Sequence, residues 1–236
     1  PLEVATAQPS LQDVIQTTPT HVVGISYPKD FDAPPGLARV LLDYAEQARG
    51  GLIQALDELG NDKPRVPYEL SLSFTVTADT PQLLAVSADG SRYTGGAHGE
   101  PLLARFVWLR QAQTLLTSDV LITDPAGRAI VAGYVEDALI AQMEARLQGE
   151  KLDVSELSSA RAQASEMIRD GTQPDAGNFR QFQPVLSADG RIAALRFVFP
   201  PYQVGPYSDG TQSVDVPANI LLPHVAPAYV ALFDPS

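Results

Sequence analysis

The chain has 236 residues, of which 44% are hydrophobic and 19% charged, and it carries a formal net charge of −12. This is a globular composition, and a chain of this length can bury about 70% of its unfolded surface. The acidic balance argues against nucleic acid and anionic membrane surfaces as partners, because both require Lys and Arg, and it favours a cationic protein partner. The absence of cysteine excludes disulfides and thiolate metal sites.

The first twenty residues contain three prolines, few apolar anchors and no helical period, so residues 1–20 are predicted to be a flexible tether. No apolar run approaches the roughly eighteen residues of a membrane span. The first residue is Pro1 rather than Met, which leads us to expect that a leader was removed by processing or by design.

The first half of the chain alternates between strand and helix patterns. Apolar residues at helical spacing predict one long helix over Leu37–Leu59, in which Gly50-Gly51 indicates a kink or a close packing contact. Strict alternation over Tyr68–Thr77 predicts an antiparallel strand with one wet face. Further strands are predicted at His21–Tyr27, Gln82–Ala88 and Leu102–Leu109, with a weaker strand or turn at Thr114–Ile122.

The second half begins with a helix signal at Asp124-Pro125, an N-cap residue followed by proline at the first helical position. A shorter helix is predicted over Ser155–Arg169, ended by Gly171. Two strands, Asn178–Leu186 and Arg191–Phe199, are predicted to form a hairpin around Ala188-Asp189-Gly190. The second of these is apolar on both faces, which predicts a central strand. A short strand over Ser213–Val216 and a proline-broken helix over Asn219–Phe233 complete the chain.

Hairpin-like groups of strands with helices between them predict an α+β fold, with a largely antiparallel sheet and two or three packed helices. We expect one domain, residues 21–236, with an N-terminal lobe over 21–112 and a C-terminal lobe over 119–236.

Two glycine-punctuated aromatic segments stand out as candidate binding loops. The first is Ser91–Glu100, with Tyr93, Gly95, Gly96 and His98. The second, Phe199–Gly210, contains Pro-Tyr-x-x-Gly twice in tandem and includes Pro201, Tyr202, Pro206, Tyr207 and Asp209. Proline stiffens a loop, and tyrosine offers a large contact area at low entropy cost. We therefore predict that the two loops meet on one rim of the fold and bind a ligand there, although each could instead be a purely structural turn.

The order Tyr93-Thr94-Gly95-Gly96-Ala97-His98, then Phe199-Pro200-Pro201-Tyr202, Pro206-Tyr207, Gly210 and Val216-Pro217, resembles a family of bacterial envelope domains of unknown function. Such domains form the extracytoplasmic half of a lysozyme-sensing anti-sigma factor, and a similar N-terminal module accompanies some peptidoglycan deacetylases. The resemblance extends over nearly all of His21–Phe233, in the same order. The chain lacks the transmembrane and sigma-binding segments and the catalytic deacetylase domain, so neither signalling nor deacetylation is carried over.

The resemblance implies a periplasmic or other extracytoplasmic location, including that of an outer-membrane lipoprotein with a lipid anchor before Pro1. It also implies a non-catalytic protein that binds or inhibits a lysozyme-type hydrolase. The alternative ligand is peptidoglycan, since Tyr93, Trp108, Tyr202 and Tyr207 could stack on sugars.

A carbohydrate hydrolase remains the rival class, with Asp89, Glu100, Asp209 and Asp215 near the proposed rim. Glycoside hydrolysis needs two carboxyl groups about 5–9.5 Å apart, and the sequence spacing does not identify such a pair. The three histidines, His21, His98 and His224, are scattered without metal-site spacing, and there is no nucleophile elbow or phosphate-binding loop. We therefore predict no catalytic residue, no metal and no cofactor.

Overall fold

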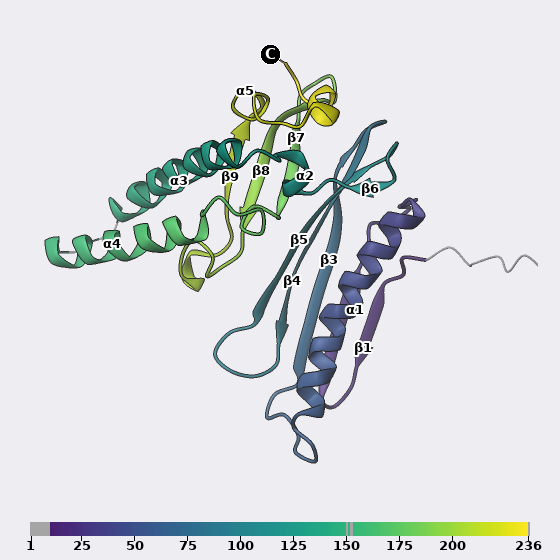
Figure 1. The fold of residues 1–236 in the computed structure, drawn as a ribbon. Helices are drawn as coiled ribbons and strands as arrows, with labels where there is room; N and C mark the ends of the chain where they lie inside the picture. Colours follow the sequence, from purple (N-terminus) through teal and green to yellow (C-terminus); the bar gives the residue numbers. More distant parts are fainter. Residues whose placement is uncertain (1–9, 150, 152, 236) are drawn as a thin grey trace, which may run out of the picture.

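The computed structural model describes residues 10–149, 151 and 153–235, and it has the predicted α+β fold. Its strands form two sheets rather than one (Figure 1). The larger sheet has the order β1-β2-β3-β4-β5-β6, and the smaller sheet has the order β7-β8-β9. All strand pairs are antiparallel except β2 (His21–Ser26) with β3 (Tyr68–Asp79), which are parallel because the long helix α1 (Pro35–Asp57) lies between them in the chain.

The N-terminal segment differs from its prediction. Residues 1–9 of the proposed tether lie outside the described residues, but Val14–Thr17 forms strand β1, which pairs with β2 at the edge of the larger sheet. The Asp13 carboxylate also accepts a hydrogen bond from the Tyr27 backbone N–H at 2.8 Å. A short edge strand needs few apolar residues because its main chain supplies the bonding, so composition did not reveal it.

The larger sheet carries α1 on one face. Buried residues of β3 at every second position pack against α1, while Ser71, Ser73 and Thr75 on the other face are exposed, which confirms the predicted alternation. β4 (Leu83–Tyr93) and β5 (Glu100–Leu109) are longer than predicted and form one hairpin. The close packing contact predicted for the glycine pair of α1 is present, since a Cβ at Gly51 would lie 1.6 Å from a guanidinium nitrogen of Arg92.

The segment after β5 was predicted only weakly, and it contains the two-residue strand β6 (Thr114–Leu115) and the short helix α2 (Ser118–Leu121). The helix α3 (Pro125–Leu147) begins as predicted, with the Asp124 carboxylate accepting hydrogen bonds from the N–H groups of Ala126 and Gly127. The helix α4 (Val154–Gly171) lies beside α3 (Figure 1) and has a capping box formed by Asp153 and Glu156.

The predicted hairpin forms β7 (Phe182–Leu186) and β8 (Ile192–Phe199), with Gly190 in the turn at φ 83°. β8 is the central strand of the smaller sheet, as its two apolar faces predicted, and β9 (Gln212–Pro217) lies on its other side. The predicted terminal helix is reduced to α5 (Ala218–Leu221) and the 3₁₀ turn η2 (Pro227–Leu232), because Pro223 and Pro227 interrupt it.

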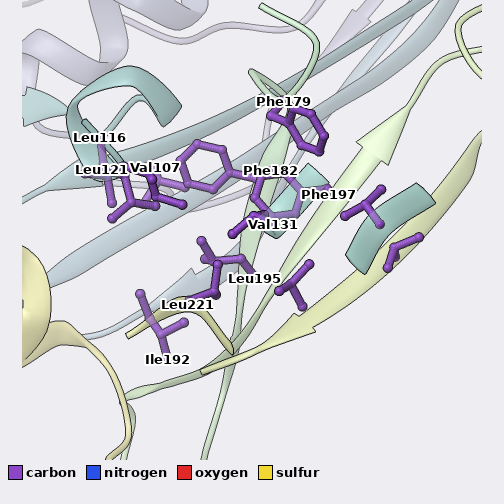
Figure 2. Packing of buried hydrophobic residues seen from close by; sticks show 14 of the residues in the cluster. Val107, Leu116, Leu121, Val131, Phe179, Phe182, Ile192, Leu195, Phe197 and Leu221 are labelled. Atoms are coloured by element: carbon purple, nitrogen blue, oxygen red, sulfur yellow. The ribbon is translucent and has the colours of Figure 1, made fainter. Parts of the chain in front are cut away.

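One of the two apolar clusters joins the two sheets, and this makes the fold a single domain. β7 lies across β3, β4 and β5. Figure 2 shows Val107 of β5, Phe182 of β7 and Leu195 of β8 in the same cluster, together with Val131 of α3. The Gln181 side chain adds a polar link, accepting a hydrogen bond from the Arg105 backbone N–H at 2.7 Å. The lobe boundaries at residues 112 and 119 stay a prediction.

Candidate functional site: an aromatic rim between two loops

The first predicted loop is the tip of the β4–β5 hairpin. Cross-strand pairing ends at Arg92 and Glu100, and the turn reverses through Gly95 and Gly96, whose φ angles are 95° and 94°. Only glycine adopts such angles readily, so this part of the motif has a structural purpose. The Tyr93 hydroxyl donates to the Gly96 carbonyl oxygen at 3.1 Å and closes the turn. His98 follows on the exposed side of the tip.

The second predicted loop connects β8 to β9 and is anchored from inside. The Gln203 side-chain amide donates to the carbonyl oxygens of Gly171 and Asn178 at 3.0 and 2.9 Å, and Val204 is buried. Tyr202 lies between the end of β8 and these two anchoring residues; its φ is 74°, and the residue is 60% exposed. A non-glycine residue with positive φ costs on the order of 1–3 kcal/mol, and strained backbone of this kind is enriched at functional sites.

The two loops meet, as predicted. The rings of His98 and Tyr207 stack with their centroids 4.6 Å apart and an angle of 19° between their planes. The ring of Tyr202 lies 5.7 Å from that of Tyr207. We call these three residues, His98, Tyr202 and Tyr207, the aromatic rim. Residues 98 and 207 are remote in the sequence, and their contact joins the tip of the larger sheet to the loop of the smaller one.

The remaining predicted residues do not join this cluster. Tyr93, Gly95 and Gly96 line a separate hollow of about 500 Å³ beside Lys63 and Arg65. Pro206 and Asp209 border a groove of about 240 Å³ between α3 and α4. Pro201 is half-buried. The predicted site therefore divides between the rim and two neighbouring surfaces.

The four acidic residues considered for hydrolysis are all ion-paired with arginines. Asp89 pairs with Arg105 at 2.8 Å, Asp209 with Arg146 at 3.0 Å, and Asp215 with Arg196 at 2.7 Å; Glu100 pairs with Arg92. The hydrogen bonds that Arg196 donates to the Asp215 carboxylate raise the pKa of Arg196. Charge-assisted pairs of this kind hold adjacent strands and loops in register.

Sequence reasoning missed the partners that support the rim. Gln203 sits inside a recognised motif, but nothing local shows that its side chain caps the end of α4. Arg92 donates both to the Ala48 carbonyl oxygen and to Glu100, and so it ties the hairpin to α1. A register for the β4–β5 hairpin would have revealed the Arg92–Glu100 pair, because the two residues lie directly opposite each other.

No metal-binding arrangement is present in the part of the chain that the structure describes, where no three His, Asp or Glu side chains are grouped for coordination. Across residues 10–149, 151 and 153–235, no helix combines the length and apolarity required to cross a bilayer.

Comparison with known proteins gives two partial family matches. Residues 16–100 match the model described as deacetylase PdaC, and residues 129–219 match a protein of unknown function, DUF3298. The solved structure of a DUF3298 family member from Bacteroides fragilis is 15% identical, with a TM-score of 0.54, and the alignment covers 93% of this chain and 94% of that one. A DUF3298 family protein from Pseudomonas aeruginosa is 16% identical, with a TM-score of 0.53 and coverage of 95% and 96%. These likenesses concern the fold. No curated protein matches.

Proposed function

We propose that this chain is a non-catalytic binding domain of the bacterial cell envelope, located outside the cytoplasm, whose aromatic rim binds a lysozyme-type cell-wall hydrolase. The observation that carries the proposal is the stacking of His98 on Tyr207, which brings two stiff loops together with Tyr202 exposed beside them. The match of residues 16–100 to a deacetylase-named model and the resemblance of the two loop motifs to lysozyme-sensing domains support the envelope assignment.

The rim suits insertion into a cleft of a partner protein. Interface energy is concentrated in a few residues, and tyrosine is among the commonest of them. The loop carrying Tyr202 is held by Gln203 and Val204 before any partner arrives, so little entropy is lost on binding. Lysozymes are cationic, and a domain with a net charge of −12 attracts them over long distances.

The ion pairs support a binding role over a catalytic one. A glycosidase requires one carboxyl group that can hold a proton for the leaving group, beside a second carboxylate. Each of the four acidic candidates instead makes an ion pair with an arginine side chain, so each carboxylate already has a guanidinium partner. Release of reducing ends from peptidoglycan by the protein alone, lost on Glu100→Gln or Asp209→Asn, would establish hydrolysis and contradict the proposal.

The direct test is a calorimetric titration of the full chain against a cationic lysozyme at low and at physiological salt. We expect a stoichiometric complex that weakens with salt and inhibits the hydrolase. Tyr202→Ala should weaken binding at least tenfold, whereas Tyr202→Phe should retain most of it because the ring remains. The matched control is Ile130→Ala, which shortens an exposed apolar side chain on α3, outside the rim, and should leave binding unchanged. Absence of binding at low salt would rule out this partner.

A second candidate ligand is the glycan itself. The rings of Tyr202 and Tyr207 are tilted by 38° at 5.7 Å and offer adjacent faces on which sugar rings can stack. In that case purified peptidoglycan should pull down the protein, Tyr202→Ala combined with Tyr207→Ala should abolish this, and lysozyme should not bind in the absence of glycan.

A further inference from the structure

A second surface, separate from the aromatic rim, has the features of a small-ligand site. The segment between α1 and β3 folds against the tip of the β4–β5 hairpin and leaves an open hollow of about 500 Å³. This volume is within the range of about 300–1,000 Å³ that is usual for small-molecule sites. We call it the basic hollow; the residues that line it include Lys63, Arg65, Tyr68, Tyr93, Gly95 and Gly96.

The two cations of the hollow differ from the arginines around the rim. Arg92, Arg105 and Arg146 are all ion-paired, whereas Lys63 and Arg65 are exposed and make no ion pair within the described part of the chain. Asp62 also lines the hollow, so the local balance is one positive charge. Against a molecular net charge of −12, such a pair marks a place where an anionic group is favoured.

Two tyrosines supply the rest of the hollow. The ring of Tyr68 is buried, and its hydroxyl makes no hydrogen bond to the residues that the structure describes. A Cβ at Gly95 would lie 3.8 Å from that hydroxyl oxygen, so glycine leaves the donor uncovered. Tyr93 uses its own hydroxyl to bond Gly96 and contributes its ring to the lining. An aromatic ring, a vacant hydroxyl donor and two cations are the groups that recognise a sugar carrying a carboxylate.

We propose that the basic hollow is a subsite for a carboxylate-bearing saccharide. Lys63 and Arg65 bind the carboxylate, the Tyr68 hydroxyl donates to a ring substituent, and the Tyr93 ring packs against the pyranose. This site goes beyond the proposed function, because none of its residues belongs to the aromatic rim and a hydrolase is not required for binding.

The test is an NMR titration of the full chain with N-acetylmuramic acid and, separately, with N-acetylglucosamine. The two sugars share one ring and differ by a carboxylate-bearing side arm. We expect saturable shifts of the Gly95 and Gly96 amide signals with the acidic sugar, and at least tenfold weaker binding of the neutral one. Raising the salt concentration should weaken the binding of the acidic sugar and leave the binding of the neutral sugar unchanged.

Variants separate charge recognition from a general surface effect. Lys63→Gln combined with Arg65→Gln should weaken the binding of the acidic sugar at least tenfold. The midpoint of thermal unfolding should not change, because both side chains are exposed. Lys29→Gln removes an exposed lysine beyond the far end of β2 and should change nothing. Equal affinity for both sugars, no effect of the double change, or the same amide shifts with inorganic phosphate alone would overturn the proposal. None of these results depends on whether a lysozyme binds.

Discussion

Gly171, the last residue of α4, packs directly against the main chain that follows Tyr202, although it lies about thirty residues earlier in the chain. A Cβ added at Gly171 would lie 2.0 Å from the Gln203 carbonyl oxygen and 2.9 Å from a Val204 methyl group. Ordinary contact begins at 3.4 Å, so the backbone of the β8–β9 loop would have to move by about 1.4 Å, the difference between the two distances. Gly171→Ala therefore tests whether the loop is held by the end of the helix.

The expected magnitude follows from what this shift breaks. Gln203 would lose hydrogen bonds of 3.0 and 2.9 Å, each contributing about 1 kcal/mol, and Val204 would lose part of a burial that contributes about 2 kcal/mol. The greater helix propensity of alanine offsets up to about 1 kcal/mol. We expect the free energy of unfolding to fall by about 2 kcal/mol, which moves the urea midpoint by roughly 1 M.

Urea unfolding followed by circular dichroism measures this change, and the lysozyme titration on the same variant reports the position of the rim. Gly133→Ala is the matched control, because Gly133 lies in α3 and a Cβ there would meet no atom within 4 Å. That change should stabilise the protein by up to about 1 kcal/mol and leave binding unchanged. If Gly171→Ala proves as stable as Gly133→Ala and binds equally well, the anchoring of the loop by α4 is wrong.

Three further changes test other parts of the fold. In Gly90→Ala the new Cβ would lie 2.0 Å from the Ser71 carbonyl oxygen of the adjacent strand, so the free energy of unfolding should fall by about 3 kcal/mol; Gly24→Ala, with no atom within 4 Å, should be far milder, and similar urea midpoints for the two would contradict this packing. Asp189 has its pKa lowered to about 2 by hydrogen bonds from Ser187 and Arg191, so its contribution to stability is present above about pH 4 and is lost as the pH falls toward 2. Asp189→Asn should therefore show a smaller loss of stability than the parent protein between pH 4 and pH 2, and parallel pH profiles would count against the assignment. Asp153→Ala removes the capping box of α4 and should cost about 1 kcal/mol, seen as faster amide exchange in the first helical turn; unchanged exchange there would show that the cap is unimportant.

Local chemistry was sufficient to predict most elements. The alternation along β3, the cap at Asp124 and the turn at Gly190 each depend on neighbouring residues alone, so they could be identified before any tertiary contact was known. The strand β1 was missed because it is only four residues long, pairs with β2 through its main chain, and has Ile15 exposed, so its apolar pattern is weak. The division into two sheets escaped because β7 crosses the larger sheet through contacts distant in sequence.

The candidate site, like the fold, was predictable from the sequence only in its local features. The sequence by itself determined which two loops were unusual, since glycine pairs and Pro-Tyr repeats impose particular backbone shapes. Only the tertiary structure decided which residues of those loops share a surface. It stacks His98 on Tyr207, and it places Tyr93 in the lining of the basic hollow. Pairing across a hundred residues depends on the packing of two sheets, and no local preference of either loop encodes that packing.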